Sequence, residues 1–173
     1  MGALSKLIII SVIILFCTYS LASYITRESD FIYETGINIT KDNQRIENMV
    51  FYDIPIGIIL WSSNNVIANC TFIECSDEGI LLIGSNNLIE NCVFYRCVDG
   101  IELQKSSNNT FINCRFLNNT HAGIDGIINS NNYNEFYNCL FYESPYGCFF
   151  KESNNNEFLN CTFMFNYKDL YEV

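Results

Sequence analysis

The sequence predicts an all-β solenoid, a parallel β-helix of about six rungs, and three observations support this prediction. A motif with an Asn-Asn pair, then Asn-Cys and an aromatic residue, recurs along the chain at a nearly constant spacing. Short runs of alternating apolar residues are separated by Ser- and Asn-rich segments, which is the pattern of strands and turns. The chain has 14 Phe and 11 Tyr but only 2 Pro. This composition favours strands and tight turns over helices.

The N-terminal segment differs from the rest of the chain. Lys6 precedes a run over residues 7–17 that is apolar except for Ser11, and the small residues Ser20 and Ala22 follow two positions apart. This order is typical of a secretory signal peptide. We therefore expect a hydrophobic signal helix over residues 1–22, with an uncleaved membrane anchor as the alternative, and a lead-in segment over residues 23–35. In either case the remaining chain is expected outside the cytoplasm, secreted or on the cell surface, with membrane contact only through an uncleaved anchor.

The repeats over residues 36–173 are predicted to be the rungs of the solenoid. The cysteine of the motif recurs in steps of 22, 22, 25 and 22 residues, and the aromatic residue two places later keeps the same steps. Stacked rungs of this length bury apolar faces that a single rung leaves exposed. A leucine-rich repeat has a similar length, but its leucine pattern and helical side are missing. The predicted structural columns are Cys70, Cys92, Cys114, Cys139 and Cys161, and Phe72, Phe94, Phe116, Phe141 and Phe163.

Asparagine and cysteine have separate predicted roles in the stack. The Asn pairs at 64–65, 86–87, 108–109, 131–132 and 154–155 are expected at a turn with left-handed backbone, where stacked amides bond to the rungs above and below. The cysteines are expected to be small buried thiols, with stacked disulfides as the alternative for an exported chain. Because CxxC spacing is absent, a cysteine metal centre is not expected, and no cofactor is expected either.

The motif Gly-Ile-x-Leu…Ser-Asn-Asn-x-Ile-x-Asn-Cys-x-Phe resembles the repeats of NosD-like proteins, the carbohydrate-binding and sugar-hydrolase (pectate-lyase-like) β-helix family. The likeness extends from Gly36 to the C-terminus. It implies a right-handed parallel β-helix, with relatives that deliver copper or that bind or cleave polysaccharides. A copper role is not carried over, because the chain has a single histidine, His121, and no Met cluster. Since one fold hosts many activities, function has to be argued from the surface.

The outward positions of the Gly-Ile-x-Leu strands are the predicted functional surface. Successive rungs place Trp, Ile, Leu and Phe there, and a monomer rarely exposes such a strip without using it. We expect this strip to bind a glycan or a protein partner, unless residues 24–35 fold back and cover it. Its predicted ligand-binding residues are Trp61, Ile59, Leu81, Ile83 and Phe149.

Glu102 and Asp125 occupy the same outward column on successive rungs, about 5 Å apart by strand spacing. Such a pair suits a retaining glycosidase, or a calcium site formed with Asp77 and Asp99. The strand "DGIE" resembles the acid-bearing strand of polygalacturonases, but the Asp-Asp, Gly-His-Gly and Arg-x-Lys signatures of that family are absent. We therefore expect solvated acids, no metal and a non-catalytic binding module.

Two other functions remain as alternatives. One is a polysaccharide-active hydrolase or lyase that uses Glu102 and Asp125, and the other is a structural rod segment of a surface protein. Nucleic acid is excluded as a partner, because the net charge is −10 and no Lys/Arg cluster is present.

The last residues are expected to begin a seventh rung. The final "DLYEV", residues 169–173, echoes "DGIEL" at residues 99–103, and this alignment predicts that Tyr171 and Val173 point inward. An open rung presents unpaired strand edges. We expect end-to-end self-association or docking through residues 160–173, with a plug of bulky side chains as the alternative.

Overall fold

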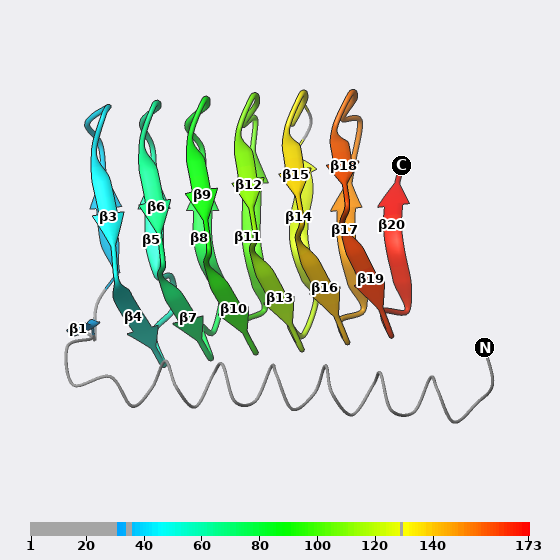
Figure 1. Cartoon of the computed structure of the whole chain (residues 1–173), viewed down its shortest axis with the longest axis horizontal. Helices are drawn as coiled ribbons and strands as arrows, with labels where there is room; N and C mark the ends of the chain where they lie inside the picture. Colours follow the sequence, from blue (N-terminus) through cyan, green and yellow to red (C-terminus); the bar gives the residue numbers. More distant parts are fainter. Residues whose placement is uncertain (1–30, 34–35, 129) are drawn as a thin grey trace. The chain divides into compact units, whose positions relative to one another are not determined.

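The computed structural model describes residues 31–33, 36–128 and 130–173. These residues form short strands wound into a regular coil, and the coil is the parallel β-solenoid that the repeats predict (Figure 1). The expected signal or anchor helix at residues 1–22 lies outside the described residues. Within the described ranges, no helical segment has the length and apolar character needed to span a membrane.

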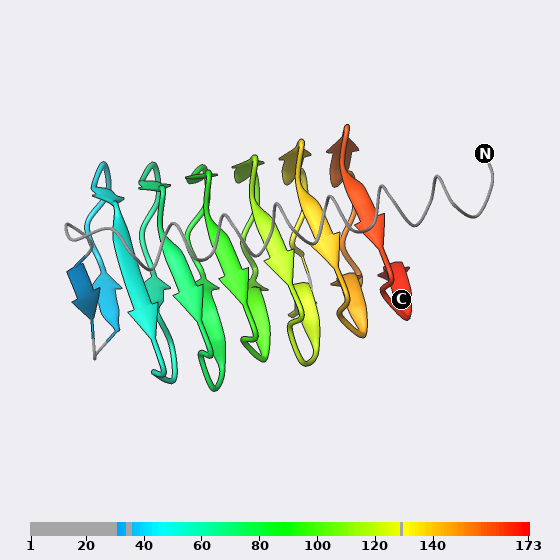
Figure 2. The same ribbon diagram turned by 60° about the horizontal axis from the view of Figure 1, so that its bottom comes forward.

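Three parallel sheets run along the coil (Figure 2). Sheet A contains β1 (Phe31–Tyr33), β4 (Met49–Tyr52), β7 (Thr71–Ile73), β10 (Val93–Tyr95), β13 (Arg115–Leu117), β16 (Leu140–Tyr142) and β19 (Thr162–Met164). Sheet B contains β2 (Ile37–Ile39), β5 (Ile58–Leu60), β8 (Glu78–Leu82), β11 (Asp99–Gln104), β14 (Ala122–Ile128), β17 (Tyr146–Phe150) and β20 (Lys168–Glu172). Sheet C contains β3 (Arg45–Glu47), β6 (Val66–Ala68), β9 (Leu88–Glu90), β12 (Thr110–Ile112), β15 (Glu135–Tyr137) and β18 (Glu157–Leu159).

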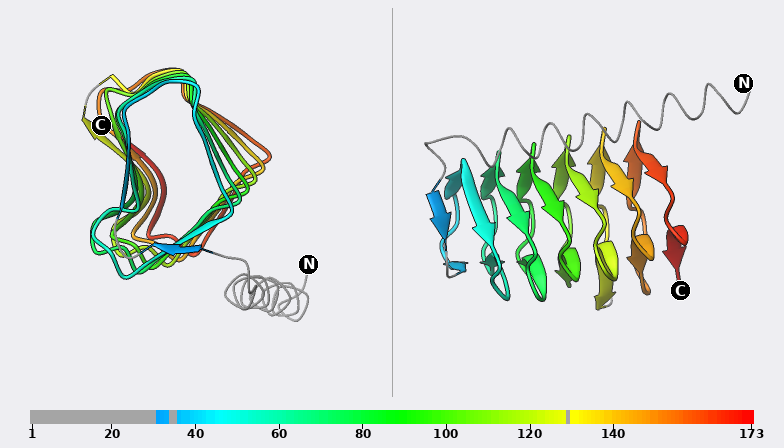
Figure 3. Two further views of the ribbon diagram at one scale, coloured as in Figure 1. Left: turned by 90° about the vertical axis from the view of Figure 1, so that its left-hand side faces the viewer. Right: turned by 90° about the horizontal axis from the view of Figure 1, so that it is seen from below.

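The core lies inside the coil and consists of stacked columns. Seen end-on, the rungs superimpose around one common interior (Figure 3). The rings of one column stack with centroids 4.6–4.9 Å apart, and its members are Phe51, Phe72, Phe94, Phe116, Phe141 and Phe163. A second column of stacked rings, which the sequence reading missed, comprises Phe111, Phe136 and Phe158. The repeat therefore stacks each phenylalanine on a phenylalanine of the next rung, which is why one motif recurs.

The glycine that opens each rung is required by this stacking. A Cβ on Gly100 would lie 2.5 Å from the carbonyl oxygen of Gly123 and 2.6 Å from the ring of Phe116. No side chain fits between the backbone of the next rung and the aromatic column. The glycine is thus a packing requirement rather than a turn requirement, and its backbone has no positive φ.

Each rung turns through residues in the left-handed backbone region. At the first of these turns Asn64, Asn86 and Asn108 have φ of 59°, 57° and 57°. Asparagine is suited to this turn because it tolerates left-handed backbone better than most other residues with a Cβ. The expectation of left-handed turns at the Asn pairs is confirmed for these three rungs.

The second residue of those pairs forms a buried amide ladder. The backbone N–H and the side-chain Nδ2 of each member donate to the Oδ1 of the next, at 2.9 and 3.1 Å between Asn65 and Asn87. The ladder members are Asn65, Asn87, Asn109, Asn134 and Asn156, although only the backbone bond links the last two. The predicted pairs at 131–132 and 154–155 are not members of this ladder, although Asn131 and Asn132 each accept a hydrogen bond from a neighbouring rung.

Extra residues in one rung explain the error. The step from Cys114 to Cys139 is 25 residues rather than 22. The amide of Asn131 holds the longer turn, because its Nδ2 donates to the carbonyl oxygens of Gly126 and Ile128 while its Oδ1 accepts from the N–H of Ser106. The insertion is therefore absorbed by a register shift within β14 and by the turn that follows, and Asn134 continues the ladder.

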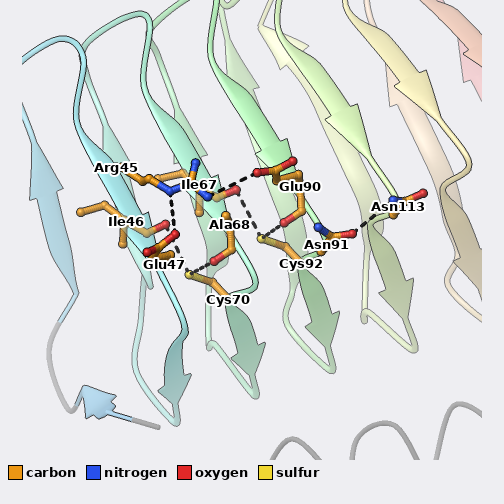
Figure 4. A network of polar contacts seen from close by, with 10 residues as sticks. All are labelled: Arg45, Ile46, Glu47, Ile67, Ala68, Cys70, Glu90, Asn91, Cys92 and Asn113. Atoms are coloured by element: carbon orange, nitrogen blue, oxygen red, sulfur yellow. Dashed lines mark hydrogen bonds and ion pairs between the residues drawn. The ribbon is translucent and has the colours of Figure 1, made fainter. Parts of the chain in front are cut away.

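A column beside sheet C holds five cysteines: Cys70, Cys92, Cys114, Cys139 and Cys161. All eight cysteines in the described residues are free thiols. Cys92 Sγ lies 3.8 Å from the carbonyl oxygen of Ile67 and 3.4 Å from that of Glu90, and Cys70 makes the equivalent contacts (Figure 4). Burial raises the pKa of Cys92 and Cys114 well above the ordinary value. These thiols are therefore packed as neutral side chains.

The register of the last strand differs from the expectation. Leu170 pairs with the inward Cys148, whereas Tyr171 pairs with the outward Phe149. The prediction that Tyr171 points inward is therefore wrong. The echo of "DGIEL" misaligned the segment by one residue, and a one-residue slip exchanges the two faces of a strand.

Candidate functional site: the outward face of sheet B

The outward face of sheet B carries one continuous column of variable side chains. The register joins Ile59 to Leu81, Leu81 to Glu102, Glu102 to Asp125, Asp125 to Phe149 and Phe149 to Tyr171. The inward neighbours of these residues belong to the buried core. The sheet therefore fixes the backbone of this column, while the residue type in the column differs from rung to rung.

The N-terminal part of this face is apolar. Trp61 is 55 % exposed, and Ile59, Leu81 and Ile83 are half-buried. The structure thus places four of the predicted ligand-binding residues on one sheet face, and the fifth, Phe149, farther along the same column.

An aromatic group that the sequence reading largely missed surrounds Phe149. Tyr146 lies 5.3 Å from Phe149 and 5.7 Å from Tyr171 between ring centroids, and Lys168 Nζ lies 3.6 Å from the ring centre of Tyr171. The misaligned last strand hid Tyr171 from the sequence analysis. Correct alignment of Leu170 with the inward Cys148 is the signal that could have found it.

Acidic residues occupy the middle of the face, and a histidine joins two of them. His121 Nδ1 lies 2.8 Å from Asp99 Oδ1 and 3.5 Å from Asp125 Oδ2. His121 directly precedes β14, Asp125 lies within it, and Asp99 begins the neighbouring β11. The N–H of Ala122 donates to Asp99 Oδ1 at 2.9 Å, which fixes that carboxylate. His121, which the sequence treats as isolated, is therefore part of a cluster.

Asp99 and Asp125 are buried despite lying on this face, at 6 % and 5 % exposed. Burial raises the pKa of Asp99, while the nearby His121 and the N–H of Ala122 oppose that rise. The carboxyl group therefore sits in a partly desolvated setting, where it interacts more strongly with a bound partner than it would in water.

Glu78 adds a further buried carboxyl group to the face. It pairs with Asp99 in the register of β8 and β11 and is 5 % exposed. Burial first, then the carboxyl groups of Glu102 and Asp77, raises the pKa of Glu78 to about 9. Its Oε2 has no hydrogen-bond partner within the described part of the chain.

The two acids of the predicted pair have different surroundings. Glu102 and Asp125 are register neighbours, as expected. Glu102 is half-buried and accepts a hydrogen bond of 2.7 Å from Gln104 Nε2, whereas Asp125 faces His121. Of the predicted calcium candidates, Asp99 and Asp125 meet at the histidine, while Asp77 is exposed and lies beside Glu78.

The arrangement defines a class of protein: an all-β solenoid whose flat sheet face carries apolar, acidic and aromatic side chains in register. Residues 35–171 match the family model for a right-handed β-helix region. The chain therefore belongs to the right-handed β-helix family.

One solved structure agrees with the fold. A tailspike protein from Acinetobacter baumannii bacteriophage Fri1, gp49, described as a capsular polysaccharide depolymerase, aligns with a TM-score of 0.70 and 18 % identity. The alignment covers 83 % of this chain and 32 % of the tailspike, so the chain spans about a third of its length. The plasmid-mediated fluoroquinolone resistance protein QnrB1 aligns with a TM-score of only 0.31 at 18 % identity, covering 78 % of this chain and 70 % of that protein. A comparison with curated protein sequences finds no match.

Proposed function

We propose that the chain is a non-catalytic module that binds a polysaccharide along the outward face of sheet B. The observation that carries this proposal is the exposed Trp61, which shares one rigid face with carboxylates and a second aromatic group around Phe149. Aromatic faces pack against the C–H faces of sugar rings, and carboxylates accept hydrogen bonds from sugar hydroxyl groups. An extended face of this kind suits an extended ligand.

The fold similarity supports this choice of ligand class. The aligned tailspike is described as acting on capsular polysaccharide. A location outside the cytoplasm would bring the chain to such a ligand. We therefore propose a secreted or cell-surface location, reached through the hydrophobic residues 7–17 as a signal or anchor segment.

A glycan array probed with the full chain tests the proposal, followed by titration calorimetry with the best glycan. Trp61→Ala is expected to abolish binding and to leave the unfolding midpoint almost unchanged, because the side chain is exposed. The matched control is Tyr52→Ala, since Tyr52 is an exposed aromatic residue on sheet A. If Trp61→Ala instead lowers the unfolding midpoint strongly, the side chain is covered by another part of the chain and the binding face is wrong.

A second candidate function, polysaccharide cleavage, is favoured by one observation. Asp99 has a raised pKa and lies in the same cluster as Asp125, which resembles the acid and the carboxylate of a glycosidase. The sequence analysis predicted Glu102 and Asp125 as the catalytic acids of this alternative. If the wild-type chain releases reducing sugar from a bound glycan and the Asp125→Asn variant does not, the chain is an enzyme rather than a binding module.

A further inference from the structure

The cluster of Asp99, His121 and Asp125 places three metal-ligating side chains around one point. One ligand atom from each lies within 4.8 Å of the others. The two separations from His121 Nδ1, 2.8 Å to Asp99 and 3.5 Å to Asp125, bracket the spacing of atoms that share an ion. Ligands at about 2.1 Å from a metal are about 3.0 Å apart in an octahedral site and about 3.4 Å apart in a tetrahedral one.

We propose that Asp99, His121 and Asp125 form a binding site for a divalent first-row transition-metal ion of the Zn²⁺ class. An imidazole nitrogen with two carboxylate oxygens suits such an ion. Calcium is disfavoured, because it takes six to eight oxygen ligands. With three protein ligands, a fourth position remains for water or for an oxygen atom of a ligand on the same face.

Two further features are those of a built site rather than of a surface ion pair. The N–H of Ala122 donates to Asp99 Oδ1 and orients it, as groups around metal ligands commonly do. Glu78, paired with Asp99 on the next strand, is more than nine-tenths buried, and its Oε2 lacks a hydrogen-bond partner within residues 36–128 and 130–173. A metal-bound water molecule would supply a hydrogen-bond partner for this oxygen.

The simpler explanation is a protonated His121 held between two carboxylates, with no metal. The two explanations differ in the state of the ring. In the first, Nδ1 is bound to the metal and the imidazole is neutral, with its proton on Nε2. In the second, both ring nitrogens carry protons and the ring binds no metal.

Nuclear magnetic resonance separates these states, because His121 is the single histidine of the chain. The imidazole signals of the full chain would be followed during titration with Zn²⁺, after treatment with a chelator. We expect a new set of signals that is complete at one equivalent, with the metal on Nδ1 and the proton on Nε2. Because the readout is the histidine ring itself, Zn²⁺ bound to cysteine cannot imitate it.

Asp125→Asn tests the carboxylate, and Asp53→Asn, at an exposed turn, is the matched control. We expect Asp125→Asn to weaken Zn²⁺ binding at the ring at least about tenfold, the scale of losses around metal sites, and Asp53→Asn to leave it unchanged. Circular dichroism confirms that each variant is folded. Unchanged histidine signals in the wild-type chain with several equivalents of Zn²⁺ overturn the proposal, as does equal binding by a folded Asp125→Asn variant. Neither result depends on glycan binding.

Discussion

Gly126 lies directly opposite Phe150 in the register of β14 and β17, and a Cβ on Gly126 would come within 2.5 Å of the Phe150 ring. In the preceding rungs the same inward position is held by Leu82 and Leu103. One rung therefore has no side chain at this position and the next has an oversized one. The large ring fills the space that the glycine leaves.

This relationship predicts a strong coupling between the two positions. Gly126→Ala alone is expected to destabilise the protein by about 1–3 kcal/mol through overpacking, and Phe150→Leu alone by about 1–3 kcal/mol through a cavity. The double variant should lose clearly less than the sum, because Ala and Leu approach the packing of the other rungs. Urea unfolding of all four proteins measures the coupling, and additive losses would contradict it.

The amide ladder predicts an effect of a single-atom change. In Asn109→Asp an oxygen replaces Nδ2, which donates to Ser106 Oγ at 2.8 Å and to Asn134 Oδ1 at 3.1 Å. A buried carboxylate would then face an acceptor, so a loss of about 3 kcal/mol or more in unfolding free energy is expected at neutral pH. Asn154→Asp, at an exposed turn position, makes the same change and should alter stability by less than about 0.5 kcal/mol.

The cysteine column predicts free thiols and a modest packing role. Cys92→Ser is expected to cost about 1–3 kcal/mol, because a hydroxyl group is buried where a thiol packs well. Cys161→Ser should cost less, since Cys161 is only partly buried at the end of the column. Alkylation of the unfolded, unreduced chain should label all eight cysteines of the described residues. Fewer than four labelled thiols would mean that stacked disulfides, not packing, explain the column.

Much of the fold could be predicted from the sequence because each rung repeats the same physical problem. Identical side chains at a step of 22 residues stack on one another, so the cysteine, glycine and phenylalanine columns are visible as periods. The prediction failed where the period changes. The step of 25 residues moved the amide ladder to Asn134, and the last segment lacks the glycine that marks register, which placed Tyr171 on the wrong face.

The candidate site was only partly predictable, for a different reason. Glu102 and Asp125 share a repeat position, so their neighbourhood follows from alignment. His121 has no second histidine at the equivalent position of a neighbouring rung, and its contacts with Asp99 and Asp125 depend on side-chain direction and burial rather than on the period. A cluster such as Asp99 with His121 becomes visible only once the register across β11 and β14 is known.

Glu78 predicts a pH dependence of stability. Its pKa is raised from the model-peptide value of 4.5 to about 9, so the folded state holds the proton more tightly than the unfolded state. Stability should therefore fall as pH rises from about 4.5 towards 9, and level off above that range. Glu78→Gln removes this contribution and should be more stable than the wild type at pH 8 but not at pH 4. Urea unfolding in chelator-treated buffer gives the free energy of unfolding of both proteins at each pH. Parallel dependences of this free energy on pH would contradict the prediction.

The last rung predicts concentration-dependent association of the 173-residue chain. Among the described strands, β18, β19 and β20 each lie at the end of a sheet, and Leu170 and Val173 are 44 % and 62 % exposed. Open edges with apolar side chains tend to pair with other strands. Sedimentation across a concentration series should show association, weakened by Leu170→Lys. A strictly monomeric chain at high concentration would show that the edge is protected.

The constant step between stacked strands also has a consequence for how the chain folds. Parallel sheets usually require long crossovers, and the entropy lost on closing them slows folding. Here most strands meet their neighbour 21 to 25 residues later, as Phe72 meets Phe94 and Phe116 meets Phe141, whatever the total length of the coil. Every added rung closes a loop of similar size, at a similar entropic cost. A chain that emerges gradually from a ribosome or a translocation channel can therefore fold in order, each finished rung serving as the template for the next.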